Sequence, residues 1–135
     1  METGLPGSSR RKILIAEHDG EFGELLMNAV KKYNFTGDLV LDGQEVLEKL
    51  KTKAYDAVLL NLVLPKINGI DVLTTIRKPE SSHRNLPVFV ITAFDHQNLI
   101  QDAFTLKADS FFLKSQLSPD AMIGEIANFF KQPKV

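Results

Sequence analysis

Short apolar runs alternate with segments of helical periodicity along almost the whole chain, and this alternation limits the possible folds more than any other feature. Five of the runs are rich in β-branched and other large apolar residues and are short enough to form single strands. Between them, apolar residues recur every three or four positions, as they do on the buried face of a helix. The predicted strands span residues 13–16, 38–41, 55–60, 88–91 and 110–113.

Residues that typically start helices stand between and after these strands. Asp19 is a candidate N-cap for the first helix, and Ser118 followed by Pro119 is typical of the start of the last one. A fourth helix is predicted over residues 97–106. The apolar side chains predicted to face the core are Phe22, Leu25, Leu26, Ala29, Val30 and Tyr33 in the first helix, Val46, Leu47 and Leu50 in the second, Ile70, Val72, Leu73 and Ile76 in the third, and Met122, Ile123, Ile126, Phe129 and Phe130 in the last.

Five strands that alternate with five helices require a parallel sheet covered by helices on both faces. Because strand–helix–strand crossovers are right-handed, such a sheet is doubly wound. The second predicted strand is the most polar, so it is expected at an edge, which favours the strand order 2-1-3-4-5. The predicted fold class is therefore α/β, a doubly wound (βα)5 sandwich around a five-stranded parallel sheet.

Length and composition indicate one ordinary globular domain. The chain has 135 residues, a formal net charge of -1 and no cysteine, which excludes disulfides and thiolate sites. No apolar run approaches the ~20 residues of a membrane span, and residues 1–12 lack the apolar centre of a signal peptide. We expect a cytoplasmic protein with a flexible lead-in at residues 1–10, one domain at 11–131 and a tail at 132–135.

Four of the predicted strands end at polar side chains. Glu17 and His18 follow the first strand, Asn61 the third, Thr92 the fourth and Lys114 the fifth. Each of these alone could be an ordinary solvated residue, since every strand must end somewhere. In doubly wound folds, however, ligands bind at the carboxyl ends of the strands. All four ends are expected at that one edge, so together they predict a site there.

Four motifs at these strand ends resemble the receiver domains of two-component response regulators, the CheY-like family. The resemblance covers about residues 11–131 and implies a flavodoxin-like fold. In that family a sensor histidine kinase donates a phosphoryl group to an aspartate after the third strand. Two acidic residues after the first strand help to hold Mg²⁺, and a hydroxyl and a lysine contact the phosphoryl group. The motifs are ILIAEHD at 13–19, LNLVLPKING at 60–69, ITA at 91–93 and FFLK at 111–114.

Matched residue by residue, the family's site is altered in this chain. Asn61 stands at the phosphoacceptor position, and Glu17 and His18 stand at the acidic pair. Thr92 and Lys114 match the hydroxyl and lysine positions. An amide is not a competent nucleophile, because its nitrogen lone pair is delocalised, and a histidine prefers softer metals than Mg²⁺. Because one expected carboxylate of three remains, Mg²⁺ binding is expected to be weak or absent, and no cofactor is predicted.

Individual residues keep structural alternatives to a role in the site. Asp19 is expected to cap a helix rather than to bind metal. Lys114 is expected to pair with Glu17 or Asn61 when no phosphoryl group is bound. His18 is either a capping or solvated residue or a part of the pocket. Thr92 is either a phosphoryl contact or a simple strand-end hydroxyl. His83 and His96 are assigned no role.

Three further positions depart from the family pattern or have two possible roles. Ser115 stands where the family usually has a proline, so the bond after Lys114 is expected to be trans, because a cis bond before a non-proline residue costs about 3 kcal/mol. Lys107 stands where glycine is common. Phe111 occupies the place of the family's switching aromatic residue, although Phe111 and Phe112 are equally candidates for the core.

The function that the resemblance implies is that of a pseudo-receiver, a signalling domain that does not accept phosphate and is not an enzyme. It would act by contact with a sensor histidine kinase or a downstream output protein, or as a homodimer, through a face that includes residues 97–106 and 121–130. The alternative is a normally phosphorylatable receiver captured as an aspartate-to-asparagine variant at Asn61. A flavin or nucleotide enzyme is disfavoured, because no glycine-rich loop follows the first strand. Neither nucleic-acid nor membrane binding is predicted.

Overall fold

The computed structural model describes residues 10–93 and 97–131. Most of the predicted lead-in (residues 1–9), His96 and the predicted tail (132–135) lie outside these residues. Five strands and five helices alternate along the described chain. They are β1 (Lys12–Ala16), α1 (Gly20–Lys32), β2 (Thr36–Val40), α2 (Gly43–Thr52), β3 (Ala57–Asn61), α3 (Gly69–Ile76), β4 (Val88–Thr92), α4 (Gln97–Thr105), β5 (Ser110–Leu113) and α5 (Pro119–Lys131).

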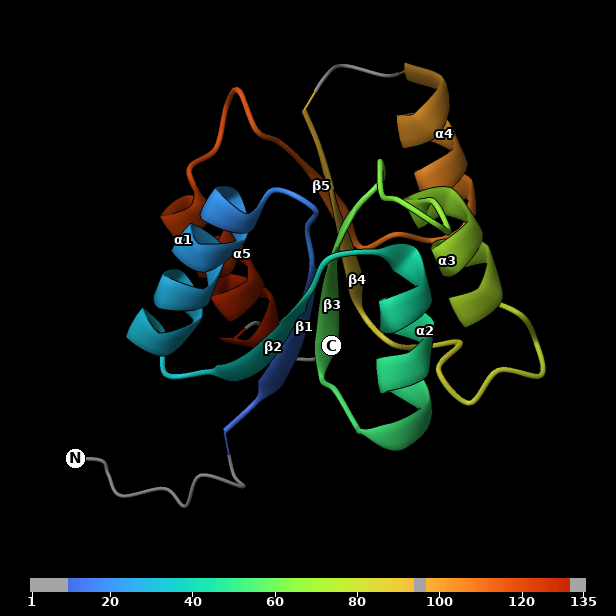
Figure 1. The fold of residues 1–135 in the computed structure, drawn as a ribbon, viewed down its shortest axis with the longest axis horizontal. Coiled ribbons are helices and arrows are strands. Elements are labelled where there is room, and N and C mark those ends of the chain that lie inside the picture. Colours follow the sequence, from blue (N-terminus) through green and yellow to red (C-terminus); the bar gives the residue numbers. More distant parts are fainter. Residues whose placement is uncertain (1–9, 94–96, 132–135) are drawn as a thin grey trace.

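All five strands form one parallel sheet in the order β2-β1-β3-β4-β5, which confirms the predicted fold class and the edge position of β2 (Figure 1). After β2 the chain returns past β1 and adds β3, β4 and β5 in turn on the other side of β1. In the register of the sheet, Ala16 lies opposite Leu60, and Asn61 lies opposite Ile91. This places the ends of β1, β3 and β4 level with one another.

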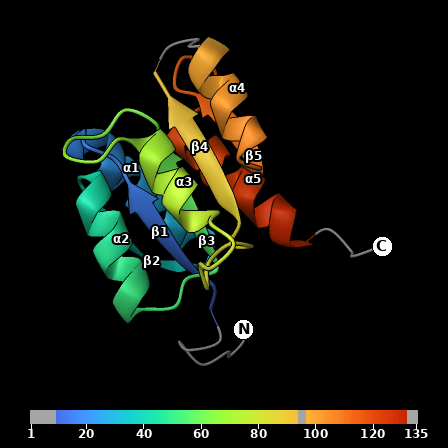
Figure 2. The same ribbon diagram turned by 90° about the vertical axis from the view of Figure 1, so that its right-hand side faces the viewer.

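The helices cover the sheet in two layers, each with its own apolar core. Helices α1 and α5 pack on one face, while α2, α3 and α4 lie side by side on the other (Figures 1 and 2). Side chains alternate between the faces along a strand. Accordingly, Ile13 and Ile15 of β1 pack in the first core, and Leu14 and Ala16 pack in the second. The central strands are therefore apolar on both faces, as parallel sheets require.

Side-chain caps fix where the helices begin. The Asp19 carboxylate accepts the backbone N–H of Glu21 at the start of α1, and Ser118 Oγ accepts that of Ala121 in α5, so both predicted caps are confirmed. Asp42 and Asn68, which in sequence are turn signals before glycine, instead cap α2 and α3. A cap of this kind contributes about 1 kcal/mol.

Two strands start two residues away from the predicted position, whereas β1 begins one residue earlier than predicted and β4 ends one residue later. β2 begins at Thr36 and not at residue 38, because Gly37 is part of the strand rather than a break before it. A Cβ at Gly37 would lie 2.6 Å from the Ile13 carbonyl oxygen, so a close approach of two strands explains this glycine. β2 also ends at Val40, which leaves Leu41 49% exposed. β3 runs over residues 57–61 and not 55–60.

Two apolar residues that were predicted to face the core are exposed instead. Leu25 is 53% exposed, because the buried face of α1 is centred on its neighbour Leu26. Phe129 is 38% exposed and contacts Phe89 with its ring edge-on, at a centroid distance of 5.2 Å. Helical spacing identifies a broad apolar stripe, but it does not show where that stripe meets solvent.

The chain departs from the family pattern at Lys107, after α4, and at Ser115, after β5. The local backbone accommodates both residues. Lys107 adopts a left-handed conformation with φ 63°, the conformation that makes glycine common at such a helix end. The next residue, Ala108, donates its backbone N–H to the Ala103 carbonyl, as in a typical helix C-cap. The bond between Lys114 and Ser115 is trans, as predicted.

No helix within the described residues combines the length and the apolar character needed to cross a membrane.

Candidate functional site

The polar residues at the strand ends come together at one edge of the sheet, as the topology predicts. Glu17 directly follows β1, Asn61 is the last residue of β3, and Thr92 is the last residue of β4. Lys114 directly follows β5. Glu17 and Thr92 are fully buried, and Asn61 is 2% exposed. Three buried polar residues at the switch point of a parallel sheet need partners, since burying an unpaired polar group costs about 1–3 kcal/mol.

The Glu17 carboxylate is the centre of the cluster. Its Oε1 accepts a hydrogen bond from Asn61 Nδ2 and forms an ion pair with Lys114 Nζ, both at 3.0 Å. Its Oε2 accepts the backbone N–H of Asp19 at 3.0 Å and lies 3.5 Å from His18 Nδ1. Both carboxylate oxygens are thus occupied by groups of the chain itself.

The Asn61 side chain uses both ends of its amide. Its Nδ2 donates to Glu17, while its Oδ1 accepts the backbone N–H of Val63 at 2.9 Å. A carboxylate at this position could serve Val63 equally well, but it would face Glu17 with a second negative charge. The surroundings therefore match an amide in both polarity and charge, because one neighbour requires a donor and the other an acceptor.

Lys114 is held from two sides. Besides its ion pair with Glu17, its Nζ lies 4.3 Å from the centroid of the Phe22 ring, within the range of a cation–π interaction. The side chain is 18% exposed. Of the two predicted partners of Lys114, Glu17 and Asn61, the structure pairs it with Glu17, and the formal charges of the lysine and the glutamate cancel.

His18 and Thr92 lie at different depths. The His18 side chain is 48% exposed and points one nitrogen towards Glu17, so it combines a place at the rim with access to solvent. Thr92 is buried at the end of β4, and its carbonyl accepts the backbone N–H of Lys114 at 3.0 Å. This hydrogen bond fixes where the chain leaves β5 and so where the lysine begins.

The loop after β3 is pressed against the strand that it leaves. A Cβ at Gly69 would lie 2.5 Å from the Asn61 carbonyl oxygen and 2.6 Å from Leu62 Cα, so a side chain at residue 69 would displace the loop. The backbone N–H of Gly69 donates to the Leu62 carbonyl. Further out, Lys66 Nζ lies 3.5 Å from the Asp42 carboxylate, which links this loop to the start of α2.

The residues at this edge do not fit the Mg²⁺ that the family resemblance implies. Mg²⁺ prefers several hard oxygen ligands in octahedral geometry. Here one carboxylate, Glu17, stands beside an imidazole and an amide, and internal donors contact both of its oxygens. Within residues 10–93 and 97–131, no three His, Cys, Asp or Glu side chains are grouped so that they could hold a metal ion.

The candidate switch residue Phe111 lies on β5 under α4. Its ring contacts that of Phe104 edge-on, at a centroid distance of 5.5 Å and an interplanar angle of 87°. Phe104 is itself 45% exposed, so this aromatic pair extends from the sheet to the surface. The neighbouring Phe112 faces the opposite core, where it stacks on Phe89.

Two contributors to the site were not predicted from the sequence. Phe22 appears in sequence only as one of the apolar residues of α1, yet its ring supports Lys114. The backbone N–H of Val63 fixes the orientation of the Asn61 amide. Helical spacing placed Phe22 on the buried face of α1 but did not show which side chain it meets, and a backbone donor leaves no trace in the sequence.

Comparison with known proteins identifies a family over nearly the whole chain. The model of the response regulator receiver domain matches residues 13–127. The transcriptional regulatory protein QseB of Haemophilus influenzae is 38% identical over 84 residues, which are 62% of this chain and 37% of that protein. The response regulator ArlR of Staphylococcus saprophyticus is 34% identical over 82 residues, 61% of this chain and 36% of that protein. The chain thus spans little more than a third of the length of these relatives.

Solved structures show the same fold. The receiver domain of Francisella response regulator 1452 aligns over 93% of this chain and 100% of its own, with a TM-score of 0.80 and 25% sequence identity. The receiver domain of the sensor histidine kinase PA1611 of Pseudomonas aeruginosa PAO1, which has a magnesium ion in its active-site cleft, aligns over 90% of this chain and 97% of its own. Its TM-score is 0.77 at 21% identity. The sheet order, the converging strand ends and the matching family model lead to one conclusion: this chain belongs to the response regulator receiver domain family of two-component signalling.

Proposed function

We propose that this receiver domain is a pseudo-receiver that signals by protein–protein contact and does not accept a phosphoryl group. The observation that carries the proposal is the Asn61 amide at the end of β3, whose Nδ2 lies 3.0 Å from the Glu17 carboxylate. We take residue 61 as the phosphoacceptor position, as the family resemblance implies. An amide nitrogen has no available lone pair, so it cannot attack phosphorus as a carboxylate oxygen does.

The charge balance of the cluster supports the same proposal. A phosphoryl group requires cations to neutralise its oxygens during transfer. In this chain Lys114 already pairs with Glu17, and the donor set is a poor one for Mg²⁺. An incoming phosphoryl group would therefore meet a cluster whose positive charge is already balanced, and on this ground we assign the domain no catalytic residue and no resident metal.

The proposed partners are signalling proteins. Receiver domains as a class interact with histidine kinases and with output domains, and the curated relatives include a transcriptional regulatory protein. For this chain we propose contact with a sensor histidine kinase or a downstream output protein, or pairing with a second copy, through the face formed by α4, β5 and α5. The partly exposed Phe104 lies on this face. The cytoplasmic location expected from the sequence remains a prediction.

The test is phosphorylation of the intact protein by a small-molecule donor. Incubation with acetyl phosphate and Mg²⁺ should leave the intact mass unchanged, because no carboxylate is available at residue 61 to form an acyl phosphate. A relative of known activity, treated in parallel, shows that the donor is competent. An added phosphoryl group that hydroxylamine removes would overturn the proposal.

A second function, that of an ordinary receiver captured as a variant, is favoured by one observation. Thr92 ends β4 and Lys114 follows β5, the places where the family resemblance implies the hydroxyl and the lysine. The variant Asn61→Asp discriminates between the two functions. If it gains a hydroxylamine-labile phosphoryl group despite His18, the second function is supported. If it gains none, while a variant that combines Asn61→Asp with His18→Asp does, His18 by itself prevents phosphorylation, and the pseudo-receiver is supported.

A further inference from the structure

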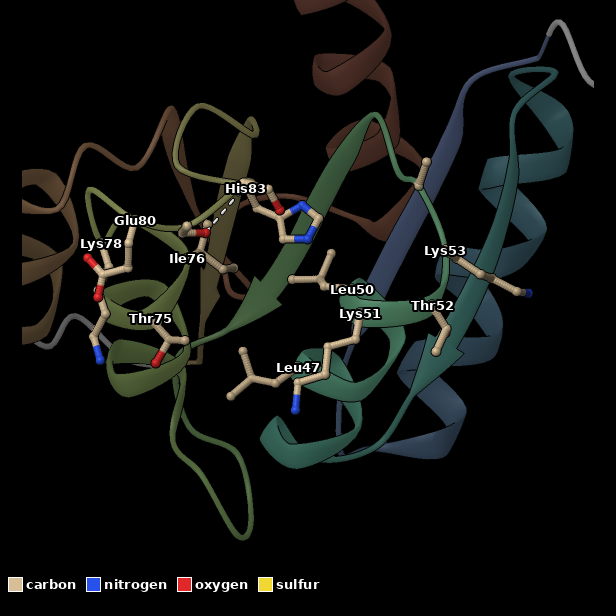
Figure 3. A pocket seen from close by; sticks show the side chains of 13 residues that line it. Leu47, Leu50, Lys51, Thr52, Lys53, Thr75, Ile76, Lys78, Glu80 and His83 are labelled. Carbon is tan, nitrogen blue, oxygen red and sulfur yellow. Dashed lines mark hydrogen bonds between the residues drawn. The ribbon is translucent and has the colours of Figure 1, made fainter.

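A groove lies at the end of the sheet opposite to the strand-end cluster. Helices in this fold run back against the direction of the strands, so the last turns of α2 and α3 lie at the edge where the strands begin. Between them and the loop that follows α3, the surface is hollowed into a groove with a volume of about 770 Å³ (Figure 3). Ligand sites typically occupy roughly 300–1,000 Å³.

The floor of the groove is aliphatic. Leu47 and Leu50 of α2 face Ile76 of α3 across it, and Leu47 is the most open of the three (Figure 3). These residues belong to the same apolar core that joins α2 and α3 to the sheet. The floor is therefore the outer side of the folded core, in which Leu50 is 5% and Ile76 is 1% exposed. An apolar side chain placed in the groove would lose contact with water mainly against the partly exposed Leu47.

The wall formed by the loop after α3 is held in place by hydrogen bonds. The backbone N–H of His83 donates to Ser81 Oγ at 3.0 Å (Figure 3). The N–H of Leu86 donates to the His83 carbonyl at 2.9 Å. Arg77 Nη1 donates to the carbonyls of Arg84 and Leu86, at 3.1 Å and 2.8 Å. Because the loop is ordered by these contacts, binding in the groove costs little further ordering entropy.

The rim of the groove is positively charged on both sides of the floor. Lys51 lies in the last turn of α2, and Lys78 lies two residues beyond α3 (Figure 3). Both are exposed, and within the described residues neither forms an ion pair. A third lysine of the lining, Lys53, forms an ion pair with the Asp38 carboxylate at 3.2 Å. Glu80 is the acidic residue among those that line the groove. Lysines at helix ends compensate the helix dipole, but that role does not account for the apolar floor between them.

We infer that this groove, which we call the α2–α3 groove, docks an acidic peptide segment of a partner protein. Aliphatic side chains of the segment would lie on Leu47, above the buried Leu50 and Ile76. Carboxylates on either side of them would pair with Lys51 and Lys78. The chain's own terminal residues, 1–9 and 132–135, contain one acidic side chain, Glu2, so they lack the charge that this rim selects.

This inference goes beyond the proposed function and concerns a separate surface. It stands whether or not the domain accepts a phosphoryl group, because the α2–α3 groove lies at the other end of the sheet from Asn61. The phosphodonor experiment and the docking experiment can therefore fail independently of each other.

The docking experiment uses fluorescence anisotropy with a labelled synthetic peptide that repeats the unit glutamate–leucine–leucine–glutamate. The whole chain should bind this peptide and should bind the lysine counterpart of the same length more weakly. A double variant with Lys51→Glu and Lys78→Glu should weaken binding about tenfold, because it turns two attractions into repulsions. Amide shifts in the NMR spectrum on peptide addition should map to residues 47–54 and 75–83.

The matched control is the double variant with Lys31→Glu and Lys131→Glu. It makes the same change in net charge, at exposed last-turn lysines of α1 and α5 on the other face of the sheet. It should bind within about twofold of the original chain. Equal weakening by both double variants, equal binding of both peptides, or shifts confined to the strand-end cluster would overturn the inference. Self-association abolished by the Lys51 and Lys78 changes would assign the groove to a second copy instead.

Discussion

At the scale of single residues, the side chain at position 61 determines whether the charges of the strand-end cluster are balanced. An amide keeps them balanced, whereas a carboxylate would add a second negative charge beside Glu17. Asn61 supplies a donor to Glu17 and an acceptor to Val63, and the ion pair with Lys114 balances the remaining charge. A carboxylate in place of this amide would put two negative charges side by side. The asparagine removes this repulsion without any change in side-chain shape.

The first prediction at this scale concerns stability. Asn61→Asp should lower the free energy of unfolding at pH 7 and without divalent cations by about 1–3 kcal/mol, since it replaces a buried hydrogen bond by a contact between two carboxylates. The nearby negative charge raises the pKa of the introduced carboxyl group. Because the folded state then binds the proton more tightly than the unfolded state, the loss of stability should shrink as the pH falls.

Urea unfolding of both proteins at several pH values measures this effect. Asn28→Asp, an exposed change of the same charge on α1, serves as the control and should alter stability by less than about 0.5 kcal/mol. Equal effects of the two changes would show that the Asn61 amide does not stabilise the cluster around Glu17.

The positions of the site residues could be predicted from the sequence, but their partners could not. Strand ends are visible as abrupt changes from apolar to polar residues, so Glu17, Asn61, Thr92 and Lys114 could be placed at one edge. The sequence left Glu17 and Asn61 as two possible partners of Lys114, and the structure pairs it with Glu17. The contact with Phe22 could not be found in this way, because helical spacing shows that a residue faces the core but not which side chain it meets there.

At the scale of secondary-structure elements, one arginine connects the ends of two helices. Arg77, at the end of α3, donates hydrogen bonds to the carbonyls of Leu86 and Arg84 in the following loop and to those of Leu106 and Lys107 after α4, at 2.8–3.1 Å. Burial lowers the pKa of its guanidinium group, and the nearby charge of Asp109 opposes this effect. Carbonyls left over at helix ends and in loops thereby obtain a donor.

Arg77→Lys should therefore be far from conservative. The four carbonyls surround the planar guanidinium group of Arg77, and the single ammonium group of a lysine cannot reach all of them. The variant should therefore lose about 2–3 kcal/mol of unfolding free energy. Urea unfolding measures the loss. Arg84→Lys, in the same loop and with one carbonyl contact at 3.3 Å, is the matched control and should lose less than about 0.5 kcal/mol. A loss of similar size in the two variants would show that the carbonyl contacts of Arg77 contribute little.

Element order was fully predictable, whereas element bounds were not. The alternation of strands and helices and the polarity of β2 were sufficient for the order 2-1-3-4-5. The start of β2 was missed because glycine commonly marks a turn, while Gly37 has to accommodate the Ile13 carbonyl inside the sheet. The Arg77 contacts were not predictable either, since they join backbone groups that are 7 to 30 residues away in sequence.

At the scale of the whole molecule, the edge strand β2 is secured by an acid-sensitive contact. The Asp38 carboxylate on β2 accepts hydrogen bonds from Tyr55 Oη at 2.6 Å and from Lys53 Nζ at 3.2 Å, both from the segment between α2 and β3. Burial pushes the pKa of Asp38 upwards, but these hydrogen bonds and the charges of Lys53 and Lys49 outweigh burial and lower it. Burial and the Asp38 carboxylate raise the pKa of Tyr55.

This contact predicts part of the response of the fold to acid. Because the folded pKa of Asp38 lies below the ordinary value of 3.8, its contribution is complete above about pH 4 and is lost as the pH falls through the folded pKa. Asp38→Asn should cost about 1–2 kcal/mol at pH 7. The difference in unfolding free energy between the original chain and the variant should then shrink below pH 4.

Urea unfolding between pH 7 and pH 2 tests this prediction. Tyr55→Phe, which removes the shorter of the two hydrogen bonds, should also flatten the acid response, because it brings the pKa of Asp38 back towards its ordinary value. A difference between the original chain and Asp38→Asn that stays constant down to pH 2 would contradict the prediction.

The balanced cluster around Glu17 has a consequence for how information would pass through such a domain. An ordinary receiver is a two-state device, and its output depends on the modified fraction of a fixed pool. If the proposed function holds, this chain has a single state, so the quantity that carries the signal is its concentration. Synthesis, degradation and competition among partners would then set the output, and the response time would follow the lifetime of the protein.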